Sequence, residues 1–171
     1  MPEHLIDCKR ILKWLLDHAG ELGFDPDSVF LTGGSAGAHL ALLMALTPNR
    51  PEFQPGFEEV NTRVQGWTGF YGAYDFYSCF EKSDPENARS VLLQVVTGGT
   101  PDSHPEIYRQ SSPFHWSSKN LPPGMMLQGE QDTLIPMEEA LSMQNHLKQE
   151  AAEKQIRSEE RRVGKECRSR W

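Results

Sequence analysis

The sequence predicts an α/β fold organised around a parallel sheet, and three observations support this. Short apolar runs alternate with longer segments that are amphipathic or apolar throughout. Turn-forming Gly, Pro and Asp residues separate them, and no internal repeat or low-complexity stretch interrupts the order. Strands that alternate with helices form βαβ units, in which the strands run parallel within one sheet.

Composition excludes several classes of protein. The chain has 171 residues, 37% hydrophobic and 24% charged, which suits a single domain with its own core and excludes a mostly disordered chain. No run approaches the roughly 20 apolar residues of a membrane span. Cys8, Cys79 and Cys167 are too few and too scattered for a disulfide framework or a zinc site. A net charge of -7 argues against a nucleic-acid-binding surface.

The first part of the chain predicts a strand between two helices. Apolar residues recur every three or four positions over 5–22, which indicates one face of a helix that Gly23 ends. The short, partly β-branched run 29–32 predicts a buried strand. Residues 38–46 are nearly all apolar, so they predict a helix buried on most faces that ends before Pro48.

The second part continues the same alternation. Glycine and proline again mark the ends of the segments. The predicted elements are a strand at 64–71, a helix that Pro85 starts and Gly98 ends, a short helix at 105–108, a strand at 125–127, and a last helix from Pro136 that turns Met137, Ala140, Leu147 and Ala151 inward.

A motif that carries chemistry lies between the first predicted strand and the apolar helix. Residues 33–37 read Gly-Gly-Ser-Ala-Gly, which fits the G-x-S-x-G nucleophile elbow. Ser35 would sit on a sharp, strained turn, and the N–H of Ala36 would face a developing oxyanion. The alternative is a glycine-rich turn or a phosphate loop. No lysine follows the glycines, so the Walker pattern fails.

A serine nucleophile needs a base and an acid that orients the base. In this kind of fold the order along the chain is Ser, then Asp or Glu, then His. Asp132 follows the predicted strand at 125–127, where catalytic groups collect in open α/β sheets. Asp132 could instead cap the next helix. Glu130 competes for the acid role but lies nearer to the strand.

Specific segments give the chain a family resemblance. Residues 25–40, Ser112-Pro113 and 129–136 resemble the α/β-hydrolase superfamily, in its hormone-sensitive-lipase-like, fold-3 type esterase branch, and the match extends from 2 to about 150. The resemblance implies a three-layer core with a parallel sheet, Ser35 as the nucleophile and Asp132 as the acid of the triad. His39 recurs in the elbow helix of that family, and we interpret it as a buried structural histidine.

Two parts of the family's machinery are missing from the sequence. No His-Gly-Gly-Gly-type run precedes the elbow, and no histidine follows His146, which lies too early and in mid-helix. We therefore expect residues 1–156 to be a partial hydrolase domain, incomplete at both ends. Residues 157–171 are rich in Lys and Arg and resemble a translated sequencing adapter, and we exclude them from functional reasoning. The alternatives are a solvated basic tail or a nucleic-acid patch.

The resulting prediction is a serine hydrolase that cleaves carboxylic esters through a Ser-His-Asp acyl-enzyme mechanism. Ser35 and Asp132 are the catalytic residues of this chain, and Ala36 gives a backbone oxyanion donor. We expect a small-molecule ester substrate, no cofactor, no metal and no nucleic acid, a cytoplasmic rather than membrane-spanning protein, and no turnover by this chain alone. The alternatives are an amide or peptide hydrolase of the same fold, or a non-catalytic binding protein.

Overall fold

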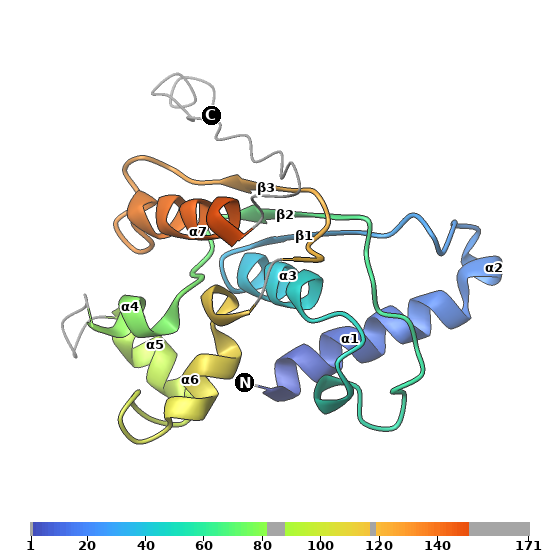
Figure 1. The fold of residues 1–171 in the computed structure, drawn as a ribbon, viewed down its shortest axis with the longest axis horizontal. Coiled ribbons are helices and arrows are strands. Elements are labelled where there is room, and N and C mark those ends of the chain that lie inside the picture. The colour runs from blue at the N-terminus through green and yellow to red at the C-terminus, as the bar shows by residue number, and fades with distance from the viewer. Residues whose placement is uncertain (1, 82–87, 117–118, 151–171) are drawn as a thin grey trace.

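A three-stranded parallel sheet lies against a layer of helices (Figure 1). The computed structural model describes residues 2–81, 88–116 and 119–150. The predicted α/β class with a parallel sheet is confirmed. The strands lie side by side in chain order, as β1 (Phe30–Gly34), β2 (Gly66–Phe70) and β3 (Gly124–Leu127).

Helices occur at nearly all the places that the sequence predicts. The predicted helix at 5–22 is divided at His18, and one short helix after β2 had not been predicted. The start predicted at Pro85 lies outside the described residues. The helices are α1 (Pro2–Asp17), α2 (Ala19–Leu22), α3 (Ala36–Leu46), α4 (Phe76–Glu81), α5 (Ala88–Thr97), α6 (Pro105–Ser111) and α7 (Met137–Glu150), with short 3-10 turns at Pro51–Phe53 and Pro113–His115.

Helix α3 is the centre of the core, as its apolar sequence predicts. It lies between the sheet and α1, so its apolar residues are covered on almost every side (Figure 1). Leu42 and Leu43 are almost fully buried, and Met143 and Leu147 of α7 join the same cluster. Each such side chain contributes about 1.5–3 kcal/mol by leaving water. The buried helix fixes the position of the turn that precedes it.

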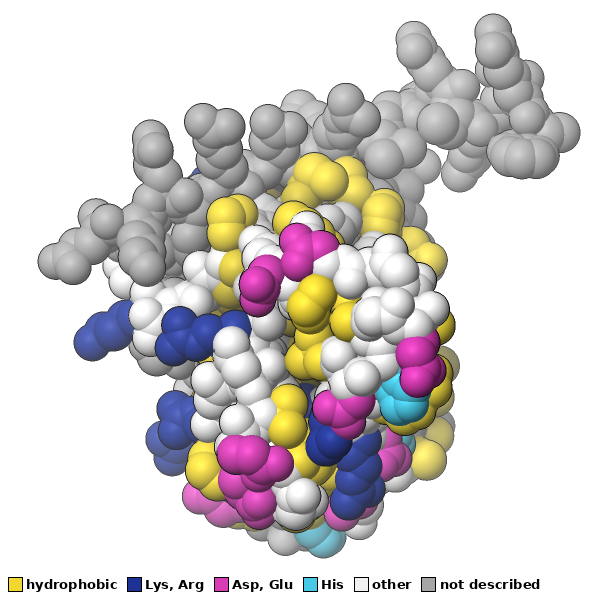
Figure 2. Space-filling view, turned by 90° about the vertical axis from the view of Figure 1, so that its right-hand side faces the viewer, with side chains coloured by type: hydrophobic (Ala, Val, Ile, Leu, Met, Phe, Trp, Pro, Cys, Tyr) yellow, Lys and Arg dark blue, Asp and Glu magenta, His cyan; other side chains and the backbone are white. Residues whose placement is uncertain are grey.

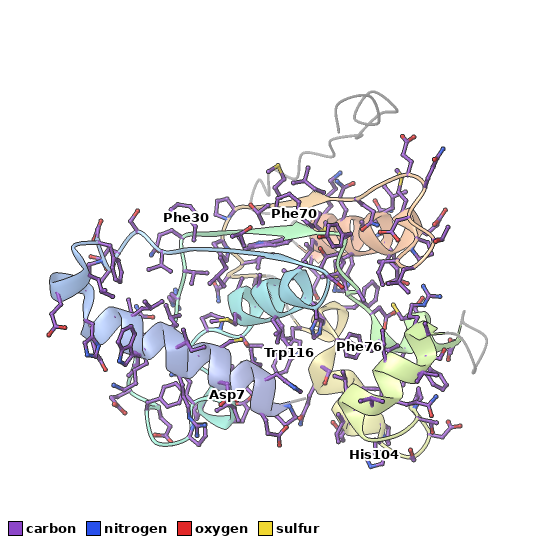
Figure 3. The ribbon with its side chains drawn as sticks, turned by 180° about the vertical axis from the view of Figure 1, so that it is seen from behind. Asp7, Phe30, Phe70, Phe76, His104 and Trp116 are labelled. Carbon is purple, nitrogen blue, oxygen red and sulfur yellow. The ribbon has the colours of Figure 1, made fainter. Side chains whose placement is uncertain are left out.

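The two faces of the sheet differ in burial. Trp67 and Met126 face the helices and are buried. Phe30 and Phe70 lie on the opposite face and are 66% and 38% exposed, and Figure 3 shows both on the side of the sheet away from α3. In Figure 2 hydrophobic side chains gather at the top, on the sheet side, and charged ones lie mainly below.

The prediction that β1 is a buried strand is therefore wrong. Within the described residues β1 pairs only with β2, and no helix covers the face that carries Phe30. The second helical layer of the expected core does not occur in residues 2–81, 88–116 or 119–150. An apolar strand sequence indicates pairing in a sheet, but it cannot say which layers are present.

Lys9 is an unexpected charged residue within the core. It lies on the inner face of α1 with 0% of its surface exposed. Its ammonium group donates hydrogen bonds to the Thr47 carbonyl, to Gln54 Oε1 and to Thr62 Oγ1. Burial lowers the pKa of Lys9 to about 8. The network ties α1 to the segment that follows α3.

None of the helices in the described ranges is both long and apolar enough to cross a membrane.

Candidate functional site

Ser35 occupies a strained turn between β1 and α3. Its backbone has φ 54° and ψ -120°, a region that non-glycine residues rarely adopt, and its side chain is exposed. Such a residue costs of order 1–3 kcal/mol, which the surrounding structure must offset. The predicted strained backbone at the start of a helix is confirmed.

Hydrogen bonds hold this turn on both sides. The Ser35 N–H donates to the Phe70 carbonyl at 2.9 Å, which fastens it to the end of β2. The Ser35 carbonyl accepts from the N–H groups of Ala38 and His39, at 3.0 and 3.2 Å, which begins α3. The hydroxyl group is thus presented by a backbone that is fixed at the strand end and at the helix start.

Only one of the two outer glycines of the motif is required by space. A Cβ atom on Gly33 would lie 2.4 Å from the carbonyl carbon of Gly37, so no side chain fits there. A Cβ atom on Gly37 would meet nothing within 4 Å. The close approach of strand and helix therefore depends on Gly33.

The N–H of Ala36 lies at the N-terminal end of α3. Ala36 is the first residue of α3, and the first N–H groups of a helix have no acceptor within it. The neighbouring N–H of Ser35 is used by Phe70. The positive end of the helix dipole adds to the attraction for a negative oxygen at this point.

The carboxylate of Asp132 organises the loop between β3 and α7. Its Oδ1 accepts hydrogen bonds from the N–H groups of Leu134 and Ile135, both at 2.9 Å. Its Oδ2 accepts from Gln128 Nε2 at 3.2 Å. Because α7 begins only at Met137, Asp132 orders this loop and does not cap the helix. Gln128, which the sequence analysis did not single out, is thus a side-chain partner of Asp132.

Ser35 and Asp132 lie at the same edge of the sheet. Ser35 follows β1, Asp132 follows β3, and β2 runs parallel between them. Neighbouring strands are 4.7–4.9 Å apart, so the ends of β1 and β3 are separated by roughly 10 Å. Two strand spacings therefore separate the strand ends that Ser35 and Asp132 follow. Glu130 is exposed in the turn after β3.

A cavity of about 250 Å³ opens beside Ser35. Leu134 and Ile135, whose N–H groups Asp132 holds, line the same cavity. His4 and Arg89 also reach it, and the sequence analysis had missed both because neither lies in a recognisable motif. The other lining residues are Ala36, His39, Leu40, Ala73, Phe76, Leu92, Leu93 and Val96.

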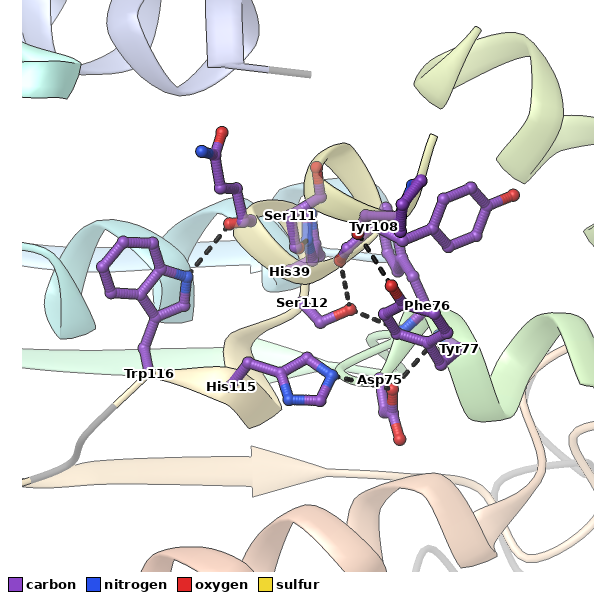
Figure 4. A network of polar contacts seen from close by, with 11 residues as sticks. His39, Asp75, Phe76, Tyr77, Tyr108, Ser111, Ser112, His115 and Trp116 are labelled. Carbon is purple, nitrogen blue, oxygen red and sulfur yellow. Dashed lines mark hydrogen bonds and ion pairs between the residues drawn. The ribbon is translucent and has the colours of Figure 1, made fainter. Parts of the chain in front are cut away.

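His39 is buried, as predicted. It is 3% exposed, it hydrogen-bonds through Nε2 to the Ser111 carbonyl at 2.5 Å, and it stacks on Phe76 with ring centroids 4.5 Å apart (Figure 4). Burial lowers its pKa to about 4, so the ring is neutral at pH 7. The hydrogen bond from His39 Nε2 to the Ser111 carbonyl links α3 to the last residue of α6.

The segment around Phe76 is also fixed by polar contacts. Its N–H donates to Ser112 Oγ at 2.9 Å, and the Ser112 hydroxyl donates to the Tyr108 carbonyl at 2.8 Å (Figure 4). Asp75 pairs with His115 at 4.0 Å. These contacts fix the position of the segment that brings Phe76 to the cavity.

The remaining candidate base of the sequence lies elsewhere. His146 is on α7, where its ring stacks on Phe114 with centroids 4.2 Å apart. It is not among the residues that line the cavity with Ser35. In the part of the chain that the structure describes, no three His, Cys, Asp or Glu side chains come together as a metal site.

Comparisons with a family model and with individual proteins agree on one family. Residues 1–147 match the BD-FAE family. The chain is 43% identical over 148 residues to "Probable carboxylic ester hydrolase LipM" of Mycobacterium tuberculosis, an alignment that covers 86% of this chain and 34% of that protein. It is 37% identical over 150 residues to "Esterase LipC" of the same organism, covering 86% and 36%. The chain thus spans about a third of the length of these relatives.

A solved structure shows the same fold. A "Truncated form of carbohydrate esterase from gut microbiota" superposes with a TM-score of 0.78 over 93% of this chain and 59% of that chain. The sequence identity is 17%, so the likeness concerns the fold alone.

Proposed function

Because the chain belongs to the BD-FAE family of α/β-hydrolase esterases, we propose that Ser35 is the nucleophile of a carboxylic ester hydrolase that acts through a Ser-His-Asp mechanism. The observation that carries the proposal is the strained, exposed Ser35 at the start of α3 and beside a cavity. Residues with strained backbone angles persist only where the surrounding structure fixes them, and they cluster at active sites. Ester substrates are favoured over amides because the relatives named above are ester hydrolases.

The proposed reaction has two stages. Ser35 Oγ attacks the ester carbonyl carbon while a histidine takes the hydroxyl proton, and the carbonyl oxygen becomes an oxyanion near the Ala36 N–H. The C–O bond to the alcohol then breaks, and the histidine returns the proton to the leaving oxygen. Water, activated by the same histidine, releases the acid from Ser35.

Asp132 is proposed to orient that histidine and to stabilise its cation. Oδ1 is occupied by two backbone N–H groups, and Oδ2 receives Gln128. A carboxylate has about four lone-pair sites, so it can still accept an imidazole N–H. We assign the histidine to a position outside this chain, in the gap between Ser35 and Asp132.

Added imidazole tests this arrangement directly, because it can occupy the gap. The protein is mixed with 4-nitrophenyl butyrate at increasing imidazole concentration, and the butyryl adduct is located by intact mass and peptide mapping. We expect an adduct on Ser35 that forms faster with imidazole and reaches saturation. General-base assistance of this kind is worth about 10²–10⁴-fold when the base is well placed.

Three variants make the experiment decisive. Ser35→Ala should remove the adduct, and Asp132→Asn should lower the imidazole-dependent rate by at least about tenfold while keeping the Oδ1 acceptor. Glu130→Gln, two residues away, should change nothing. If the adduct forms equally in Ser35→Ala, the assignment of Ser35 as the nucleophile is refuted. If the imidazole-dependent rate falls in Glu130→Gln and not in Asp132→Asn, the acid is Glu130.

A further inference from the structure

We propose that the cavity beside Ser35 binds a straight aliphatic acyl chain of short to medium length, and that Leu93 and Val96 of α5 set the length it accepts. The inference rests on the proposed function, because an ester substrate places its acyl chain in this cavity when its carbonyl carbon lies at Ser35. It adds a substrate class and two specificity-determining residues to that function.

The floor of the cavity is mainly apolar. Phe76, Leu93 and Ile135 are buried there, with exposures of 5%, 7% and 8%. His39 also faces the cavity, and its Nε2 donates to the Ser111 carbonyl. A sugar hydroxyl placed against Phe76, Leu93 or Ile135 would lose its water without a replacement hydrogen bond, which costs about 1–3 kcal/mol. An alkyl chain meets no such penalty.

The volume limits the length of the chain. At about 250 Å³, the cavity has room for on the order of eight groups the size of a water molecule or a methylene. An acyl chain of about four to eight carbons therefore fills it, and longer chains have to extend into solvent. Filling matters because each buried methylene is worth about 0.8 kcal/mol.

Helix α5 forms one wall of the cavity with a single face. Leu92, Leu93 and Val96 line the cavity, at the spacing that places residues on the same side of a helix. Val95 is 74% exposed and points away. Arg89, from the first turn of α5, reaches the Leu134 carbonyl at 3.4 Å, which links α5 to the loop that Asp132 organises.

Binding of sodium n-alkanoates, from acetate to decanoate, tests the inference by calorimetry on the chain as it stands. We expect the dissociation constant to fall about threefold to fourfold per methylene up to about eight carbons and then to level off. Benzoate is the aromatic comparison and should bind more weakly than hexanoate. Equal affinity along the series, or tighter binding of benzoate, overturns the proposal.

Adjacent residues of α5 provide a matched pair of variants. Val96→Trp should weaken octanoate binding at least tenfold and leave acetate binding unchanged, whereas Val95→Trp should alter neither. Val96→Ala should move the plateau to longer chains, so the inference remains testable if the tryptophan variant fails to fold. Equal octanoate affinity in Val96→Trp and the unmodified chain, with both folded by circular dichroism, overturns the assignment.

The two proposals fail in different ways. Alkanoate binding needs no nucleophile, so Ser35→Ala should keep the dependence on chain length. Chain-length dependence without an acyl adduct on Ser35 refutes the proposed reaction and leaves an apolar ligand cavity. An adduct on Ser35 without chain-length dependence supports the reaction and overturns the acyl cavity.

Discussion

Gly33 lies so close to Gly37 that a methyl group on Gly33 would come within 2.4 Å of the Gly37 carbonyl carbon. The end of β1 and the first turn of α3 meet at this point. The contact allows the chain to reverse between strand and helix within the single strained residue Ser35.

Replacing each of these glycines by alanine should show which of them is required because no side chain fits there. Gly33→Ala must displace backbone, so we expect a loss of about 1–3 kcal/mol in the free energy of unfolding. Gly37→Ala meets nothing within 4 Å and lies within a helix, so it should be neutral or stabilise by up to about 1 kcal/mol. Urea denaturation measures both. Equal losses in the two variants would show that the elbow is not limited by this contact.

The strain at Ser35 predicts an unusual stabilising substitution. With φ 54° and ψ -120°, glycine fits this turn and alanine does not. Ser35→Gly should therefore unfold with about 1 kcal/mol more free energy than Ser35→Ala. Thermal and urea unfolding of the two variants give the comparison. If alanine is as stable as glycine, the turn is unstrained and the main support for the nucleophile is lost.

Burial of His39 predicts a specific loss of stability in acid. Its pKa is about 4 in the folded protein and about 6.5 when unfolded, so the unfolded state binds the extra proton between these values. Stability due to the neutral ring is complete above pH 6.5 and is lost as the pH falls toward 4. The loss is about 3 kcal/mol. We expect the free energy of unfolding to fall more steeply over this range in the unmodified protein than in His39→Gln.

The control for this measurement is an exposed side chain that does not titrate. Val95 is 74% exposed, so Val95→Gln should keep the pH slope of the unmodified protein. Carboxylates contribute equally to all three proteins, and the difference between the slopes isolates His39. Parallel slopes for the unmodified protein and His39→Gln would place the ring in a wetter environment than the structure shows.

Replacing the buried Lys9 should lower the free energy of unfolding, although Lys9 is not among the residues that line the cavity. Lys9→Met leaves the Thr47 carbonyl, Gln54 and Thr62 without their shared donor, which should cost about 1–3 kcal/mol at pH 7. Lys13→Met, on the more exposed side of the same helix, should cost at most about 0.5 kcal/mol. Similar losses in both variants would contradict a structural role for the buried ammonium.

The pH dependence of the same pair gives a second measurement. The pKa of Lys9 is about 8 in the folded protein and about 10.4 when unfolded. The unfolded state therefore binds more protons between pH 8 and 10.4, and stability should rise over this range in the unmodified protein. The rise should persist in Lys13→Met and be absent in Lys9→Met.

Without added imidazole, this chain should hydrolyse 4-nitrophenyl butyrate no faster than Ser35→Ala does. A serine without a base is a poor nucleophile. The absence of a second oxyanion donor lowers the rate by a further factor of about 10²–10³. The release of 4-nitrophenolate measures the rate. Turnover that depends on Ser35 would point to His4, which lines the cavity, and His4→Gln would then abolish it.

The local chemistry of the elbow was more predictable than its surroundings. The strained Ser35 and the buried α3 follow from residues that are neighbours in sequence, and the structure shows both. The cavity depends on His4, Arg89 and Val96, which come from distant segments, so no local pattern could have joined them. Lys9 lies on a helical face that periodicity marks as apolar, and only the acceptors supplied by Thr47, Gln54 and Thr62 allow its burial.

Within the described residues one face of the sheet is uncovered, and we expect this face to make self-association depend on ionic strength. Phe30 and Phe70 present apolar surface beside a strand edge that can pair with another strand. The net charge of -7 opposes close approach of two copies. The range of that repulsion shrinks from about 30 Å at 0.01 M salt to about 8 Å at 0.15 M, whereas contact between apolar faces does not need charge. The protein should therefore remain dispersed in dilute buffer and scatter more light as salt is added.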